Sequence, residues 1–538
     1  MSEKKPFLQA AGIVGVLTLL SRFLGLFRDM ALASVFGASR IGDIFLIAFE
    51  LPNLTRRVLG EGSLSAFIVP IFSRVRAEMG EKRGWLFASN ALTTIGLFTS
   101  VLTLLGMAFA PLLFSILGYG YVERGDTEAI RLGAELTRIM FPFQIMLALS
   151  ALMMGFCHSL RHFTMPSLGS SSLNITMIIV ALLSSKIKDV HLFACIMGYA
   201  VLLGVFIRLV IMLPPLMQRG FRYTLRLQPA SSHMKELYLM MLPATFGMAV
   251  AQINVTISRA FATKLGEGYI PCLMYSNHLV QMPVAIIAGA LGTAILPQLS
   301  QYVLQNRRED LENLVRFAFR IVLILFMPAM LAFMALGHPM VEVLFQRKNW
   351  DAVATEKAYW ALLFYAPALI WWGMQQILLP LYYARKDIKT TVWTGAAAML
   401  LNIALNVTVV FTPYLKEHLG HGGLALANTL GVALNTVLLQ IILTRRGMKL
   451  WDATVTITAL KTFAAACVMG AAAWGMWHGL YTLVPHSHLT GLFLLSVVII
   501  ISVGVYFTAA FLLQVPDLRE AFQMVIRKFR KSAPTTGE

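Results

Sequence analysis

The chain has 538 residues, of which 58% are hydrophobic and 13% are charged, and its formal net charge is +18. A soluble domain carries about 25% charged residues, so this composition excludes a soluble globular protein and indicates a polytopic membrane protein. The positive charge does not indicate nucleic acid binding, because most of it lies in short loops, where Lys and Arg orient membrane helices.

Apolar runs of about 20 residues, each long enough to cross a bilayer, follow one another along the chain. The first run continues too far for a signal peptide and lacks a small-residue cleavage site, so we interpret it as an uncleaved span. Pro52 and Pro283 are expected to break the second and eighth runs. The sequence thus predicts an all-α protein with about fourteen transmembrane helices. The expected spans are 11–36, 41–72, 88–118, 131–156, 165–184, 190–217, 236–263, 270–303, 313–345, 356–383, 390–412, 420–444, 453–482 and 488–514.

Lys and Arg are distributed unevenly between the two sides of the membrane. One set of alternate loops, together with both termini, holds about 24 of them, and the other set holds about 10. Because the cytoplasmic side carries the excess, we expect both termini in the cytoplasm, which requires an even number of spans. The basic tail at 515–538 is expected to lie on anionic membrane lipid.

The second group of six spans repeats features of the first. "ALASVFG" at 31–37 matches "AFATKLG" at 260–266, and "GSLSAFIVPIFS" at 62–73 matches "GALGTAILPQLS" at 289–300. Since six is an even number of helices, the two copies are parallel lobes, an architecture in which transporters place the substrate path between the lobes. The expected domains are a first lobe at 1–217, a cytoplasmic linker at 218–235, a second lobe at 236–446, two further helices at 447–514 and the tail.

The first span carries charges near its middle, in the stretch "SRFLGLFRD". A charge there costs at least about 2.5–3.5 kcal/mol, so Arg22, Arg28 and Asp29 are expected to face protein, water or a ligand. Arg22 and Asp29 are seven residues apart and share one helix face. The second span adds a stripe formed by Asp43, Glu50, Arg57 and Glu61, with Arg56 on another face.

These charges support two interpretations. Arg22 with Asp29, and Arg57 with Glu61, could form internal ion pairs that only hold two helices together. Ser or Asn would meet that need at lower cost, whereas arginine forks onto phosphate and stays charged regardless of pH. The arginines of the two spans, gathered around a polar hollow, therefore predict an anionic, phosphorylated substrate.

The stretch "SRFLGLFRD", followed by "DIFLIAFELPNLTRR", closely resembles motifs of the MurJ/MviN family, lipid II flippases of the MOP superfamily. "GALGTAILPQLS" and "YYARKDIKT" are similar to later signatures of that family. The resemblance implies fourteen helices in two lobes, alternating access, and transfer of lipid II to the outer leaflet of a bacterial inner membrane. It also implies that Arg22, Arg28 and Arg56 bind the pyrophosphate, with Asp43 as their acidic partner.

The chain departs from the family in the eighth span. The family often places an acid, an arginine and an acid there, whereas this chain has Asn277, His278 and Gln281. His278 can form a hydrogen bond with phosphate, and Arg259 is expected to compensate for the missing positive charge. Glu50 stands where some members carry a lysine. The residues expected to support the cavity or its gating are Ser21, Asp29, Glu50, Asn53, Arg57, Glu61 and Gln281.

Some members of the family hold sodium between the seventh, eleventh and twelfth helices. The side-chain oxygens of Asn254, Asn402, Asn406 and Thr429 are nearby and could ligate a cation. An acid is missing there, and ordinary interhelical hydrogen bonds are the alternative. The four cysteines lack paired spacing, so the sequence predicts neither a disulfide framework nor a metal site.

We expect the chain to flip lipid II without changing a covalent bond, and therefore to be no enzyme and to need no cofactor. The membrane potential or a monovalent cation could drive it. A flippase of another lipid-linked glycan or a MOP-superfamily drug exporter is the alternative, although a cationic-drug site would show net acid. An enzyme using His158 or His278 is disfavoured, because neither has a nucleophile or carboxylate at a fixed spacing. The expected partners are lipid II, membrane lipids and proteins of cell-wall synthesis.

Overall fold

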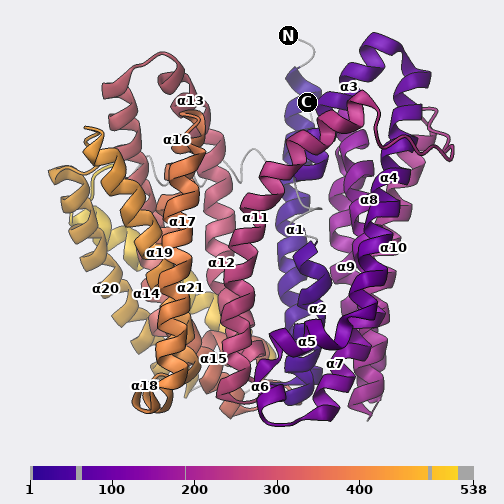
Figure 1. Cartoon of the computed structure of the whole chain (residues 1–538). Helices are drawn as coiled ribbons and strands as arrows, with labels where there is room; N and C mark the ends of the chain where they lie inside the picture. Colours follow the sequence, from indigo (N-terminus) through magenta and orange to yellow (C-terminus); the bar gives the residue numbers. More distant parts are fainter. Residues whose placement is uncertain (1–3, 56–62, 188, 483–486, 519–538) are drawn as a thin grey trace, which may run out of the picture. The chain divides into compact units, whose positions relative to one another are not determined.

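The computed structural model describes residues 4–55, 63–187, 189–482 and 487–518. Within these ranges the regular elements are helices, which confirms the all-α fold class (Figure 1). The chain forms two compact units, Met1–Ile270 and Pro271–Glu538. The lobe boundaries expected from the sequence stay a prediction.

The first unit contains α1 to α11, and the second contains nearly all of α12 and the helices that follow. The first-unit helices are α1 (Lys4–Phe36), α2 (Arg40–Thr55), α3 (Ser63–Met79), α4 (Glu81–Ala108), α5 (Ala110–Leu117), α6 (Tyr119–Glu123), α7 (Thr127–Met140), α8 (Phe143–Ser159), α9 (Thr164–Leu183), α10 (Val190–Met217) and α11 (Ser232–Leu265). The others are α12 (Tyr269–Ala294), α13 (Leu296–Leu304), α14 (Arg308–Phe345), α15 (Ala352–Tyr365), α16 (Ala368–Ala384), α17 (Ile388–Phe411), α18 (Pro413–His418), α19 (Gly420–Arg445), α20 (Ala453–Tyr481) and α21 (His488–Leu512).

Among the described residues, 10 helices are long and apolar enough to cross a membrane, or 11 if α15 and α16, bent by 45°, form one span. This confirms a polytopic membrane protein, but the expected count of fourteen is not confirmed. The three remaining expected spans, 11–36, 41–72 and 236–263, fall on α1, on α2 with α3, and on α11. Parts of the chain or of the side chains there lie outside the description.

The predicted helix breaks at two prolines are wrong. The helix α2 continues through Pro52 to Thr55, and α12 continues through Pro283 to Ala294. The eighth expected span breaks instead at Ile295, just before the first turn of α13. Proline inside a membrane helix is tolerated because neighbouring helices and local adjustments satisfy the freed backbone groups.

The stretch 218–231, which joins α10 to α11, is fastened along α4, and we call it the strap. Asn90 donates from Nδ2 to the Gln228 carbonyl at 3.0 Å and accepts from the Gln228 amide at 2.6 Å. Phe221 is buried against Trp85, with ring centroids 5.4 Å apart. These contacts make the strap part of the first unit's core, which α3, α4, α8 and α10 also build.

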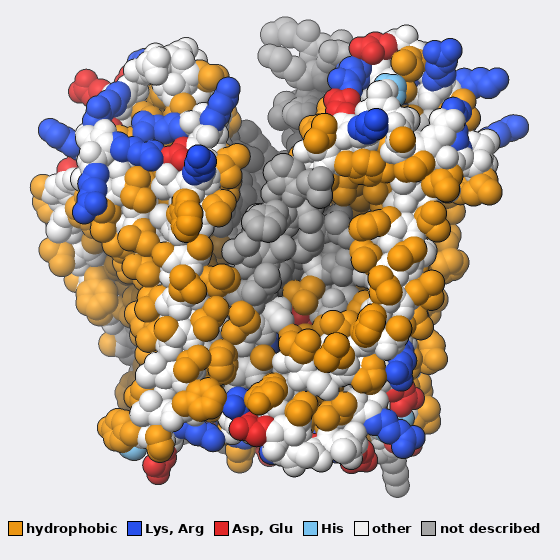
Figure 2. Space-filling view, viewed as in Figure 1, with side chains coloured by type: hydrophobic (Ala, Val, Ile, Leu, Met, Phe, Trp, Pro, Cys, Tyr) orange, Lys and Arg blue, Asp and Glu red, His pale blue; other side chains and the backbone are white. Residues whose placement is uncertain are grey.

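The flanks of each unit are apolar. Figure 2 shows hydrophobic side chains covering them, while Lys, Arg, Asp and Glu gather toward the upper and lower ends of the view. Large apolar side chains point outward, since Leu104 is 66% exposed, Leu183 77% and Ile500 70%. Apolar patches of this extent are not stable in water, so the units are built to be surrounded by lipid.

Candidate functional site

The middle of α1 carries a connected polar group. Arg28 donates from Nη2 and Nε to the same carboxylate oxygen of Asp29, at 2.6 and 3.0 Å. Its Nη1 donates to Asn174 Oδ1 on α9 at 3.1 Å, and Asn174 Nδ2 donates to the Ser21 carbonyl at 3.2 Å. Asp29 is buried, whereas 18% of the Arg28 side chain is exposed. The guanidinium is therefore fixed in orientation and still partly accessible.

Arg22, the other predicted arginine of α1, has an exposed side chain. The sequence placed Arg22 and Asp29 on one face as a candidate pair, and the structure shows Asp29 in an ion pair with Arg28. The remaining charges predicted for the second span lie outside the described residues. They are Arg56, Arg57 and Glu61.

A second ion pair joins α2 to α11. Arg259 Nη1 lies 2.5 Å from Glu50 Oε2, and the two side chains are 19% and 5% exposed. Asn53, one turn after Glu50, donates from Nδ2 to the same oxygen at 3.3 Å. The charge of Arg259, expected to compensate in the cavity, is thus neutralised by Glu50 in this conformation.

Asp43, in the first turn of α2, is fully buried and accepts three hydrogen bonds. Its carboxylate receives the amides of Gly268 at 2.6 Å and Ile270 at 3.1 Å, at the start of α12. The third donor is the Tyr121 hydroxyl of α6, at 3.1 Å. Burial raises the pKa of Tyr121, and the Asp43 charge raises it further, so the hydroxyl stays protonated and donates. Asp43 therefore fixes the beginning of α12 in this conformation.

In the second unit, α12 carries the residues by which the chain departs from the family. His278 is partly buried, and Gln281 donates a hydrogen bond to Asn277 one turn earlier. Ser276 fastens the same helix by donating to the Ala358 carbonyl of α15 at 2.6 Å. Whether His278 contacts phosphate stays a prediction.

The residues considered for sodium make hydrogen bonds within the second unit. Asn406 Nδ2 donates to Asn402 Oδ1 at 2.8 Å on α17, and Thr429 of α19 donates to the Phe364 carbonyl of α15 at 2.7 Å. All three side chains of the candidate group on α17 and α19 are buried. The side chain of Asn254 lies outside the description, so the sodium site stays a prediction.

Sequence reasoning missed two residues that position the predicted ones. Asn174 orients Arg28, and its signal was the one amide side chain in the predicted membrane helix α9. Tyr121 holds Asp43, but a tyrosine in a loop between two spans carried no comparable signal. Their partners lie 146 and 78 residues away, which a single sequence does not connect.

The chain matches the sequence model of a family described as lipid II flippase MurJ over residues 32–506. It is 31% identical to the lipid II flippase MurJ of Burkholderia cenocepacia, over 80% of this chain and 82% of that protein. It is 30% identical to the probable lipid II flippase MurJ of Vibrio cholerae serotype O1, covering 88% and 90%.

Solved structures show the same fold. A lipid II flippase MurJ in an inward closed conformation aligns with a TM-score of 0.72 and 22% identity, covering 92% of this chain and 97% of that one. A multidrug resistance MATE family transporter of the MOP superfamily, in an inward-facing conformation, aligns with a TM-score of 0.65 and 13% identity, covering 81% and 98%.

Proposed function

Because the chain belongs to the lipid II flippase MurJ family, we propose that it carries lipid II from the inner to the outer leaflet of the bacterial inner membrane. The family match over residues 32–506 is the observation that carries this proposal. The substrate is a disaccharide-pentapeptide on undecaprenyl pyrophosphate, and transport by alternating access breaks no covalent bond. The protein therefore has to supply a polar cavity with fixed cationic side chains that bind the pyrophosphate.

We assign the pyrophosphate first to Arg22 and Arg28. Arg22 is exposed, and Arg28 is oriented by Asp29 and Asn174 before any substrate arrives. Such preorganisation reduces the conformational entropy lost on binding, and the guanidinium fork suits two phosphate oxygens. Arg56 joins this assignment through its match to the family motif.

Three other predicted residues receive more specific roles. Arg259 can bind the pyrophosphate only if its ion pair with Glu50 breaks first. The contact between Arg259 and the substrate therefore belongs to another conformation of the transport cycle. Asp43 already accepts three hydrogen bonds. We therefore propose that Asp43 acts by positioning the start of α12 and does not touch the substrate. His278 is proposed as a hydrogen-bond donor from α12.

We further propose that transport needs no cofactor and is driven by the membrane potential or a monovalent cation. One elementary charge moving through 100 mV is worth about 2.3 kcal/mol, which makes arginines in the spans suitable carriers of that energy. The distribution of Lys and Arg between the loops supports both termini in the cytoplasm. We also propose contacts with proteins of cell-wall synthesis, because lipid II is an intermediate of that synthesis.

The test is complementation with a leaflet readout. A bacterial strain depleted of its own flippase expresses the chain, and an added enzyme that cleaves lipid II but does not cross the inner membrane reports the outer-leaflet fraction. Wild type should restore that fraction, whereas Arg22→Ala and Arg28→Ala should each lower it by about tenfold or more, because a charged hydrogen bond is worth about 1.5–3 kcal/mol. Arg83→Ala, at an exposed position in the first turn of α4, is the matched control.

A wild-type chain that is present at normal abundance and leaves lipid II in the inner leaflet contradicts the proposal. Another lipid-linked glycan has the same pyrophosphate, so the arginines do not discriminate between the two substrates. Transfer of a different undecaprenyl-linked glycan to the outer leaflet when the chain is expressed, with lipid II still in the inner leaflet, would favour that alternative.

A further inference from the structure

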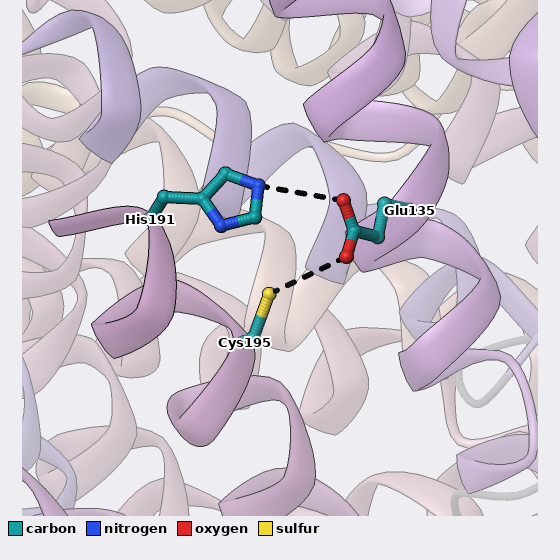
Figure 3. Close-up of side chains that lie close together, drawn as sticks. All are labelled: Glu135, His191 and Cys195. Carbon is teal, nitrogen blue, oxygen red and sulfur yellow. Dashed lines mark hydrogen bonds and ion pairs between the residues drawn. The ribbon is translucent and has the colours of Figure 1, made fainter. Parts of the chain in front are cut away.

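A cluster of metal-ligating side chains lies outside the polar groups of α1 and α2. Glu135 projects from α7, while His191 and Cys195 project from the first turns of α10 (Figure 3). His191 Nε2 lies 3.4 Å from one carboxylate oxygen of Glu135, and Cys195 Sγ donates to the other oxygen at 3.9 Å. Their three ligand atoms lie within 4.8 Å of one another, and no other such group exists among the described residues.

The helices place these side chains together. His191 and Cys195 are four residues apart, so they stand on one face of α10. Asp189 caps that helix by accepting from the amide of His191 at 2.9 Å and that of Leu192 at 3.2 Å, which fixes the first turn. Gly198 permits close packing on α7, since a Cβ there would lie 3.1 Å from a side-chain carbon of Ile139.

The spacing is close to that around a tetrahedral metal ion. With metal–sulfur, metal–nitrogen and metal–oxygen distances of about 2.3, 2.0 and 2.1 Å, tetrahedral ligands are separated by about 3.6 Å for S···O and about 3.4 Å for N···O. The Cys195 sulfur lies 3.9 Å from one Glu135 oxygen and the His191 nitrogen lies 3.4 Å from the other, and the three ligand atoms lie within 4.8 Å of one another. Side-chain rotation that turns one carboxylate oxygen toward both the thiol and the imidazole would bring the three ligands around one ion.

We propose that Glu135, His191 and Cys195 bind one zinc-class transition-metal ion, with water in the fourth position. Thiolate and imidazole select such ions over Mg²⁺ and Ca²⁺, which prefer oxygen ligands. Binding releases the Cys195 thiol proton to solvent and leaves a thiolate on the metal. Zn²⁺ then links α7 to α10 in the first unit. Under the topology expected from the loop charges, the site opens on the side of the membrane opposite to the termini.

Sequence reasoning predicted no metal site because it considered the four cysteines, which show no paired spacing. Glu135 and Cys195 are 60 residues apart, and only the packing of α7 on α10 brings them together. The proposal also stands apart from lipid II transport, since it uses none of the residues assigned to the substrate. Its test can therefore be read by metal binding alone.

The experiment uses the full chain in lipid nanodiscs, purified with an affinity tag that contains no histidine, and Co²⁺ as the spectroscopic probe. Wild type should bind about one Co²⁺ per chain with a thiolate-to-cobalt absorption band, and Zn²⁺ should displace it. Cys195→Ser should abolish the band, whereas Cys467→Ser, at an exposed cysteine of α20, should keep it. Glu135→Gln and His191→Ala should each weaken binding by about 100-fold, because even groups that only orient a ligand are worth about 10–100-fold.

A second measurement does not depend on how the variants fold. In wild type, Zn²⁺ should protect Cys195 from maleimide alkylation, and removing the Zn²⁺ with a chelator should restore the reaction. The proposal is wrong if wild type shows no cobalt band, if the band survives Cys195→Ser, or if Zn²⁺ leaves the alkylation of Cys195 unchanged.

Discussion

The ion pair between Glu50 and Arg259 makes a quantitative prediction about the first unit. The two atoms are 2.5 Å apart, and the side chains are 5% and 19% exposed. At about 4 Å between charge centres and an effective dielectric constant of about 20, their attraction is about 4 kcal/mol. Removing one partner of a buried pair costs about 3–5 kcal/mol, because the other charge stays buried without compensation. We expect Arg259→Gln and Glu50→Gln each to destabilise the unit by about 3 kcal/mol.

The double variant separates packing from function. Glu50→Gln with Arg259→Gln leaves two neutral amides that can bond to each other, so its loss of stability should fall short of the sum by at least about 2 kcal/mol. Thermal unfolding in nanodiscs, followed by the fraction of soluble monodisperse protein, measures the three variants against wild type. If the losses simply add, the two side chains are not coupled and the reasoning fails.

The same double variant also tests the role of Arg259 in transport. If Arg259 only pairs with Glu50, the stable double variant should restore outer-leaflet lipid II in the depleted strain. If Arg259 exchanges Glu50 for pyrophosphate, the double variant should be stable and inactive. Activity equal to wild type at equal abundance would end the proposed substrate contact.

Further predictions concern a loop, the strap and α12. The hydrogen bonds from Arg40 lower the pKa of Asp126, so the Asp126 carboxylate stabilises the folded state above its unfolded pKa of about 3.9 and loses that contribution as the pH falls through the lower folded value. Asp126→Asn should remove this part of the acid sensitivity of thermal unfolding, and an unchanged pH profile would contradict the prediction. Asn90→Ala deletes both bonds to Gln228, so limited trypsin digestion should cut the strap several-fold faster at unchanged global unfolding temperature, whereas equal rates would show that the strap is held elsewhere. If His278 contacts phosphate, His278→Arg should support growth and His278→Ala should impair it; robust growth with His278→Gln and death with His278→Arg would rule the contact out.

Much of the fold could be predicted because its physical signals are local. Apolar length identifies membrane helices wherever few charges interrupt it, as in α10 and α21. Whether a proline breaks its helix is not a local property. The backbone groups freed around Pro283 can form hydrogen bonds with neighbouring groups that the sequence does not reveal, so α12 continues through it.

The candidate site was predictable only in its residue types. Charges in the apolar span of α1 had to be functional or paired, and this argument selected Arg28 and Asp29, which the structure places in an ion pair. It could not identify their partner Asn174, nor show that Glu50 lies against Arg259, because those contacts join distant segments. The cluster of Glu135, His191 and Cys195 could not be predicted for the same reason.

The strap also bears on how the chain can be altered. Fourteen residues separate Met217 from Ser232, and a loop of that length on the surface is usually the first choice for an inserted epitope or reporter domain. Tolerance to insertion depends on the hydrogen bonding and burial of the backbone that is interrupted, and here Phe221 and Gln228 are both committed to α4. A domain inserted between Phe221 and Gln228 would disrupt the contacts of the strap with α4. The exposed residues just before α11 are therefore the safer insertion point.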